Sequence, residues 1–376
     1  APNASCNDLW LSWPAMQERA ISAGTVLVWD VMTSVGNLFL AFDTMMKFVR
    51  LLDLGIILTW TRFPGFRAAF NPGAVDWSVD GGEVMQQMDP VKGGAFATGL
   101  HLLKFRDFSM VLSYSQLELL ARTLGIDETN AKALATYFQE ALPDRLSRFM
   151  GDVMRRPLKT NKALRLQPCT WNMFLSRSPS MVASLEQHSP WGMVGDASGP
   201  RHQTAEYIAW HIRTPVGETV QSYKPTVHKY VVQEPSSEVC PTYLVAMEDA
   251  LQLAKSCHAS LSSHAVDEMV YISSNSKQMA KDCTVEAAHH DIVMGHVDMG
   301  LNASDAHTAH SHHPLETALG AFLDFLFLMD ATVIVRTKSS FSGTVVSIKG
   351  LECQKEVYDS LPARELLLCL PSDCQT

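Results

Sequence analysis

Three patterns follow one another in residues 316–344, and they constrain the fold of this chain more than any other feature. Apolar side chains recur at helical spacing from Leu319 to Phe327, which indicates a helix. Residues 331–335 are then rich in β-branched types, as in a buried parallel strand. A hydroxyl-rich turn and a second apolar stretch come next. This succession of helix, strand, turn and helix is typical of an α/β fold.

The hydroxyl-rich turn is a candidate phosphate-binding site. In α/β folds, ligands bind beyond the carboxyl ends of the strands, and phosphates bind at a helix N-terminus. Hydroxyl groups and backbone N–H groups in the turn suit a diphosphate. The simpler alternative is that the serines only cap the following helix. The residues of the turn are Thr337, Ser339, Ser340, Phe341, Ser342 and Gly343.

The totals for the whole chain exclude several classes of protein. With 376 residues, the chain is long enough for two domains. Apolar residues make up 47 % and charged residues 18 %, which is typical of a globular chain with a large core and not of a disordered one. The net charge is −9 and no basic patch with interleaved aromatic residues occurs, so we expect no nucleic-acid partner.

Several features favour the lumen of the secretory pathway. Two glycosylation sequons begin at Asn3 and Asn302, and eight cysteines permit disulfides. The chain starts at Ala1 without Met, which suggests a trimmed or truncated N-terminus. Asp324 and Asp330 interrupt the longest apolar run, so we expect no membrane span, and any anchor of the precursor would precede Ala1. The alternative is a cytosolic chain with scattered buried cysteines.

The N-terminal part is predicted to begin as a βαβ unit. Strands are expected at 25–29 and 56–60, and an apolar helix that opens at Gly36 and Asn37 connects them. Helical periodicity then covers much of 116–156.

A stretch rich in Ser, Pro and Gly at 176–204 is the predicted linker between two domains, 1–200 and 201–376. Ser115, with Glu118 three residues later, is the predicted capping box of the first helix of the 116–156 region. After the linker the α/β pattern restarts, with strands expected at 207–212 and 269–273 and helices at 244–256 and 276–283.

A second candidate anion site lies at the end of the predicted strand 207–212. The side chains of His211 and Arg213 are two residues apart, so alternation places them on the same face. An Arg at a strand end can donate paired hydrogen bonds to phosphate oxygens; a structural ion pair is the alternative. Glu218, in the next loop, adds a carboxylate near the same end.

Three segments of the C-terminal part resemble a known family. They read HIR at 211–213, VYISSNS at 270–276 and FLDFLFLMDATVIVRTKSSFS at 322–342. Together they resemble the donor half of GDP-fucose-dependent fucosyltransferases, most closely the α1,6-fucosyltransferase and O-fucosyltransferase group. The likeness covers 205–350, and a looser likeness covers 24–77.

The resemblance implies a GT-B-like α/β fold, in which two Rossmann-like halves face each other across a cleft. It implies transfer of fucose from GDP-fucose to a glycan acceptor with inversion, without a metal cofactor, in the Golgi lumen. The acceptor would bind on the N-terminal side and the donor on the C-terminal side. Arg213 takes the position of the family's phosphate-gripping Arg. The loop that begins at Val216 resembles the segment that carries the family's proposed base, and Glu218, offset by one residue, is the candidate for that base. The implied donor-binding residues are Gly36, Asn37, His211, Arg213, Asp324, Thr337, Ser339, Ser340 and Phe341.

The chain also departs from the α1,6 enzymes. Thr214 stands where they have a second Arg, Asn275 and Ser276 where they have acidic residues, and Thr332 where they have an Asp. Two alternatives therefore stay open. One is a protein O-fucosyltransferase or a transferase of another nucleotide sugar, and the other is a catalytically silent module that binds nucleotide or glycan.

A histidine-rich stretch suggests a different activity. Its spacing suits zinc or copper, although a solvated loop is the alternative and the resembled family needs no metal. Half of the chain's 14 histidines lie here, at His289, His290, His296, His307, His310, His312 and His313.

Overall fold

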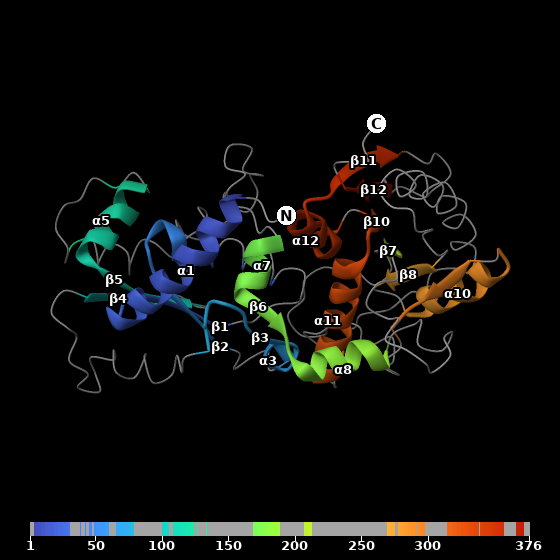
Figure 1. Ribbon diagram of the computed structural model, residues 1–376, viewed down its shortest axis with the longest axis horizontal. Helices are drawn as coiled ribbons and strands as arrows, with labels where there is room; N and C mark the ends of the chain where they lie inside the picture. The colour runs from blue at the N-terminus through green and yellow to red at the C-terminus, as the bar shows by residue number, and fades with distance from the viewer. Residues whose placement is uncertain are drawn as a thin grey trace, which may run out of the picture. The chain divides into compact units, whose positions relative to one another are not determined.

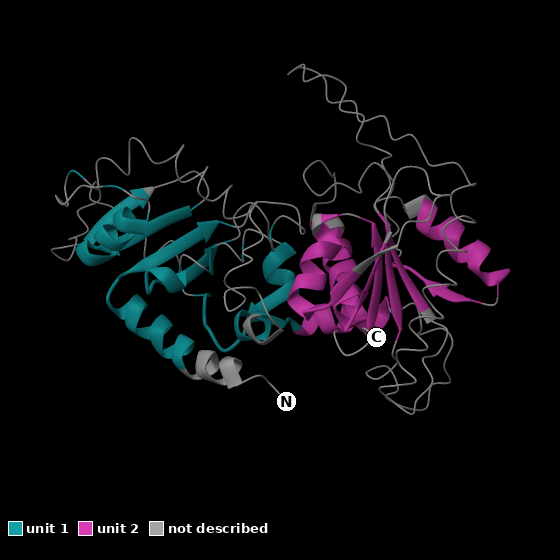
Figure 2. Cartoon of the chain, turned by 90° about the horizontal axis from the view of Figure 1, so that it is seen from above, with its two compact units in different colours: residues 1–33, 37–178 teal, residues 34–36, 179–376 magenta. Residues whose placement is uncertain are grey.

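The computed structural model divides the chain into two compact units, 1–33 with 37–178 and 34–36 with 179–376 (Figure 2). The sequence predicted a boundary after residue 200, whereas the two units divide after residue 178. The residues that the structure describes are 4–30, 49–59, 65–78, 100–104, 108–123, 168–188, 207–212, 269–274, 277–290, 292–297, 314–337, 339–356 and 366–371, with the single positions 38, 42, 45, 46, 126 and 133.

The first unit contains a four-stranded mixed sheet with strand order β2-β1-β5-β4. Strands β1 and β2 are parallel, whereas β5 is antiparallel to both β1 and β4. A second, two-stranded sheet pairs β3 with β6. The elements of this unit are α1 (Ala4–Ser22), β1 (Val26–Asp30), β2 (Gly55–Thr59), α3 (Gly65–Ala69), β3 (Phe70–Pro72), β4 (Leu100–Lys104), β5 (Phe108–Ser113), α5 (Tyr114–Thr123), α7 (Pro168–Phe174) and β6 (Leu175–Arg177).

The predicted βαβ unit is confirmed, although helix α1 precedes it in the chain. Strands β1 and β2 pair in parallel, and five of the described positions between them are helical and carry buried apolar side chains. Gln17 in α1 adds a polar anchor, since its side-chain amide both donates to the carbonyl of Ile56 and accepts from its N–H, at 2.8 Å each. The buried helical positions are Leu38, Phe42, Met45, Met46 and Val49.

The second unit is built on a six-stranded sheet with strand order β11-β12-β10-β7-β8-β9. The strands β10, β7, β8 and β9 are parallel, and β12 runs antiparallel to both of its neighbours. The elements are α8 (Pro179–Gln187), β7 (Ile208–Ile212), β8 (Met269–Ser274), α10 (Lys277–Ala288), β9 (Val293–Gly295), α11 (Pro314–Asp330), β10 (Val333–Thr337), α12 (Ser340–Lys349), β11 (Glu352–Glu356) and β12 (Leu366–Leu370) (Figure 1).

Helices cover both faces of this second sheet. On one face, Trp210 and Val335 belong to a buried cluster that includes Met279 and Cys283 of α10. Side chains alternate along a strand, so the residues between them point to the opposite face. That face packs against α11 and α12, as the ring contacts of Tyr271 with α11 show. A mostly parallel sheet between helices confirms the predicted α/β class.

The succession predicted for 316–344 is also confirmed. Helix α11 carries a buried apolar side and β10 is buried along its whole length, which suits a central parallel strand. Helix α12 begins directly after the turn. It ends at Gly350, whose φ of 69° and ψ of 24° place it in the left-handed region that favours glycine at a helix C-terminus.

The capping box of α5 differs from its prediction by two residues. The helix begins at Tyr114, and Ser113 is the capping residue in place of Ser115. The Ser113 hydroxyl accepts from the N–H of Gln116 at 3.4 Å, and the Gln116 side chain accepts from the N–H of Ser113 at 2.8 Å. Part of the predicted linker is likewise regular, because the end of β6 and all of α8 lie within it.

Cys353 of β11 and Cys369 of β12 face each other across the hairpin and form a disulfide, and Cys283 is disulfide-bonded as well. None of the described helices combines the length and the apolar character that a bilayer crossing requires.

Candidate functional site

The candidate site lies where the parallel strands β7 and β10 end and helix α12 begins. In the sheet register, His211 of β7 stands beside Arg336 of β10, so both side chains point to the face that α12 covers. Thr337 is the last residue of β10, and its hydroxyl lies 3.5 Å from the carbonyl oxygen of His211, to which it donates. All three residues are buried. The carboxyl ends of the two central strands are thus held together next to a helix N-terminus.

Ser339 caps helix α12. Its backbone is extended, with φ −150° and ψ 145°, and its hydroxyl oxygen accepts a hydrogen bond from the N–H of Phe341 at 3.2 Å. The N–H of Gly343 donates to the Ser339 carbonyl oxygen at 3.0 Å, which is the first intrahelical bond. The capping alternative from the sequence is therefore correct for Ser339. Capping leaves other first-turn N–H groups without intrahelical acceptors, so it does not conflict with anion binding.

Aromatic rings fix the orientation of His211. Its imidazole stacks on the ring of Phe341, with centroids 5.4 Å apart and planes 29° apart. Phe325 of α11 meets the same Phe341 ring edge to face at 5.6 Å. The turn, the strand β7 and the helix α11 are therefore packed together through one half-buried phenylalanine.

Asp324 lies on α11 and accepts a hydrogen bond from the hydroxyl group of Tyr271, the central residue of β8. The Tyr271 ring also stacks on Phe327, with centroids 4.8 Å apart. Burial and the neighbouring Asp324 carboxylate both raise the pKa of Tyr271 well above its usual value. The carboxylate predicted to bind the donor is thus oriented by a neutral, buried tyrosine.

Arg336 was not among the residues predicted for the site, although it lies at its centre. Its side chain is 8 % exposed, and it donates from Nη2 to the Ser339 carbonyl oxygen at 2.8 Å and from Nε to the Thr337 carbonyl oxygen at 3.4 Å. Burial lowers the pKa of the Arg336 guanidinium from its ordinary value. The sequence did contain a signal for this contact. Arg336 is a cation in an otherwise apolar strand, and a glycine, Gly343, follows on the next helix.

The remaining predicted site residues divide into two groups. The backbone of Ser340 forms the first residue of α12, and Phe341 packs as described above. Gly36, Asn37, Arg213 and Glu218 lie outside the described residues.

The histidine-rich stretch is described only in part. Nδ1 of His296 lies 3.1 Å from the Thr284 hydroxyl, and His289 and His290 end the α10 region. His307, His310, His312 and His313 lie outside the described residues. Within the part of the chain that is described, no group of three or more His, Cys, Asp or Glu side chains could hold a metal ion.

Comparison with known proteins gives similarity at the level of structure alone. No protein-family model matches the chain, and no curated protein matches it by sequence. NodZ α-1,6-fucosyltransferase soaked with GDP-fucose is 9 % identical, with a TM-score of 0.43, over 92 % of this chain and 98 % of that one. Fucosyltransferase NodZ from Bradyrhizobium is 10 % identical with a TM-score of 0.40 over the same shares. A variant of Arabidopsis thaliana FUT1 in complex with GDP is 11 % identical, with a TM-score of 0.46, over 93 % of this chain and 78 % of that one. Scores of this size carry no further conclusion.

Proposed function

We propose that this chain is a glycosyltransferase that transfers fucose from GDP-fucose to a glycan acceptor, with inversion and without a metal ion. One observation carries the proposal: the capped N-terminus of α12 lies at the carboxyl ends of β7 and β10. This is where α/β folds bind phosphates. The motif resemblance falls on these same elements, because HIR includes the end of β7 and T-K-S-S-F-S joins β10 to α12.

In this proposal the leaving diphosphate is bound by the turn and by Arg213. Negative charge grows on the diphosphate as the bond from the sugar C1 to the phosphate oxygen breaks, and fixed positive groups stabilise that charge. The first N–H groups of α12 and the guanidinium of Arg213, which follows β7 by one residue, would supply them.

The acceptor hydroxyl attacks C1 from the opposite side, which inverts the configuration. Its oxygen forms the new bond to C1, GDP leaves with the electron pair of the old bond, and Glu218 takes the proton as general base. Asp324, oriented by Tyr271, is proposed to bind the nucleoside part of the donor. The first unit would carry the acceptor site and the second unit the donor site.

A secretory location is part of the same proposal. The Cys353–Cys369 disulfide is the kind of bond that oxidising compartments maintain. Sequons such as those at Asn3 and Asn302 are glycosylated in the same compartments. We propose the Golgi lumen as the site of the reaction.

The first test is a calorimetric titration of the protein with GDP, UDP and ADP, without added metal. We expect GDP to bind in preference to the other two, and Arg213→Ala to lower its affinity at least about tenfold because a charge-assisted pair is lost. Absence of nucleotide binding by the unaltered protein would overturn the proposal.

Thr214 gives weight to a second candidate, a module that binds donor or glycan without catalysis, because it stands where the resembled enzymes have a second Arg. The two candidates differ in turnover. GDP release from GDP-fucose in the presence of glycan acceptors supports the enzyme, whereas tight GDP binding without any consumption of GDP-fucose supports the silent module.

A further inference from the structure

Arg336 is an unusual residue to find inside a sheet. The guanidinium is charged at neutral pH, and only 8 % of the residue is exposed. No carboxylate among the described residues forms an ion pair with it, and its Nη1 forms no hydrogen bond within that part of the chain. Burying a charge without a counter-charge is unfavourable, so a buried cation of this kind usually has an anionic partner.

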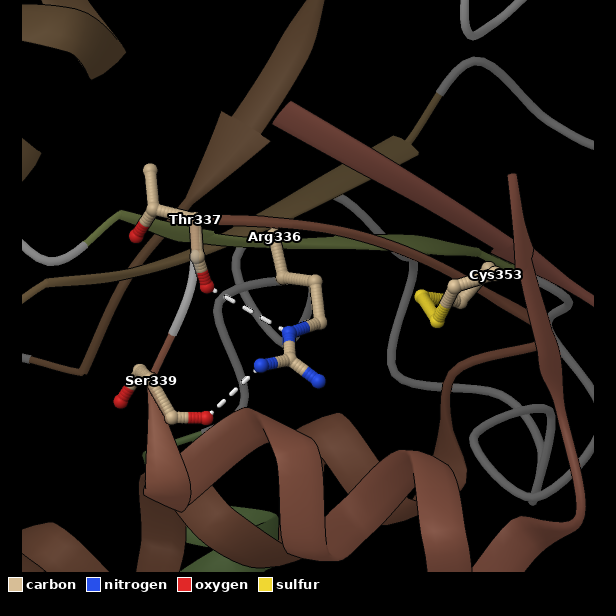
Figure 3. The surroundings of a disulfide bond; sticks show 5 residues. Arg336, Thr337, Ser339 and Cys353 are labelled. Carbon is tan, nitrogen blue, oxygen red and sulfur yellow. Dashed lines mark hydrogen bonds between the residues drawn. A yellow bond between two sulfur atoms is a disulfide. The ribbon is translucent and has the colours of Figure 1, made fainter. Parts of the chain in front are cut away.

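The surroundings of Arg336 are shaped around its guanidinium. Figure 3 shows the side chain extending from the end of β10 toward the start of α12, where it reaches the carbonyl oxygens of Thr337 and Ser339. Gly343 provides the space, because a Cβ at this position would lie 3.0 Å from Nη1 and 3.2 Å from Nη2. The Cys353–Cys369 disulfide lies on the same face of the sheet, since Cys369 pairs with Ile334, two residues before Arg336.

The guanidinium of Arg336 lies next to the N-terminus of helix α12, which is also positive. The N-terminus of a helix carries a partial positive charge from its aligned peptide dipoles, and Arg336 contacts the capping residue of α12. Two backbone carbonyl groups offset part of the guanidinium charge, yet both positive groups act on one small region. An anion bound at the first turn of α12 would be attracted by both positive groups.

We propose that Arg336 is a positioning residue of the diphosphate site, resting on the function proposed above. It holds the carbonyl groups of Thr337 and Ser339 so that the first turn of α12 is fixed for phosphate binding. It also contributes positive charge beside the turn, from a side chain that is 8 % exposed. The ligand class is a nucleoside diphosphate, bound through its phosphates at this point.

Three probes separate the charge of Arg336 from a general structural role: GDP, guanosine and inorganic pyrophosphate. The variants are Arg336→Met, which keeps most of the length and loses the charge, and Arg336→Lys, which keeps the charge and loses the fork. Lys349→Met is the matched control, because it removes one positive charge from the other end of α12, where Lys349 donates to the Met329 carbonyl oxygen. Circular dichroism and thermal unfolding confirm that each variant is folded.

We expect Arg336→Met to lower GDP and pyrophosphate affinity by roughly tenfold or more, as the removal of a desolvated charge does, and to leave guanosine affinity unchanged. The dependence of GDP binding on salt should weaken in the same variant, because fewer charges contribute. Arg336→Lys should bind GDP more tightly than Arg336→Met, and Lys349→Met should resemble the unaltered protein.

Several results would overturn the inference. These are unchanged GDP affinity in Arg336→Met, an equal loss of guanosine affinity, or GDP binding by Arg336→Lys that is weaker than by Arg336→Met. The failure of the proposed function is distinguishable from these. If the unaltered protein binds pyrophosphate but not GDP, and Arg336→Met loses that binding, the nucleotide-sugar function fails while the diphosphate role of Arg336 stands. If the unaltered protein binds neither, both fail.

Discussion

The pair formed by Tyr271 and Asp324 couples a candidate ligand-binding carboxylate to the core. A buried hydroxyl that donates to a charged acceptor contributes about 1.5–3 kcal/mol, more than one that donates to a neutral acceptor. We expect Tyr271→Phe to lower the free energy of unfolding by that amount near pH 8. The matched control is Tyr207→Phe, since the Tyr207 hydroxyl donates to the Phe327 carbonyl oxygen at 2.6 Å. That neutral acceptor predicts a smaller loss, about 0.5–1.5 kcal/mol.

The pH dependence of Tyr271→Phe follows from the raised pKa of Tyr271. Above the unfolded pKa of tyrosine, about 10, the unfolded chain loses this proton while the folded chain keeps it. Stability from this group is therefore complete below pH 10 and is lost as the pH rises above it, by about 1.4 kcal/mol per pH unit. The difference between the unaltered protein and Tyr271→Phe should shrink from pH 9 to pH 11 in urea titrations, and a constant difference would contradict the assignment.

Single residues of the site were predictable to different degrees. Ser339 and Thr337 were predicted as candidates because a turn between an apolar strand and an apolar helix is a local pattern. Arg336 was missed because the sequence V-I-V-R-T shows its position on a strand, but not which helix covers its face. The orientation of Asp324 was equally closed to local reasoning, since its partner Tyr271 lies 53 residues earlier in the chain.

At the scale of elements, the contribution of the α12 cap to stability can be measured separately from its proposed contribution to GDP binding. Ser339→Ala removes a hydroxyl that accepts from a backbone N–H, which costs about 1 kcal/mol at helix N-termini. Without the cap, the first turn is less well fixed, so we expect GDP affinity to fall several-fold as well. Ser113→Ala is the control, because it removes the corresponding cap of α5 in the other unit.

The two cap variants should therefore agree in stability and differ in binding. Chemical unfolding measures the first property and calorimetric titration the second. Equal GDP affinity in Ser339→Ala and Ser113→Ala would show that the cap of α12 is structural only.

The helices and strands were predictable where one local pattern dominated. Helix α11, strand β10 and helix α12 follow from hydrophobic period and turn residues within a single stretch. The start of α5 was misplaced because Ser113 and Ser115 are each followed three residues later by a Gln or Glu. The end of β5 at Ser113 decides between them, and that depends on its pairing with Leu100 of β4. Register between strands is a tertiary property and has no local signature.

At the scale of the whole molecule, the sheet of the second unit joins the disulfide to the candidate site. Strand β12 lies between β11 and β10. Its Cys369 forms the disulfide with Cys353 of β11, and its backbone pairs on the other edge with β10, which ends at Thr337. The pairing of the cysteines was not readable from the sequence, because eight cysteines allow many connectivities. The strand order was not readable from the sequence either. The α/β class was predictable because it depends only on the alternation of patterns along the chain.

This connection predicts that GDP and the disulfide act on the same thermal transition. Cys353 and Cys369 are 16 residues apart, and a disulfide that closes a loop of this length stabilises by about 3 kcal/mol. Differential scanning calorimetry of the full chain with Cys353→Ala and Cys369→Ala together should show a transition lowered by roughly 6–12 °C. Saturation with GDP at about 100 times its dissociation constant should raise that same transition, by about 2.7 kcal/mol in stability. A chain in which GDP raises one transition and the double variant lowers a different one would place the nucleotide outside the second unit.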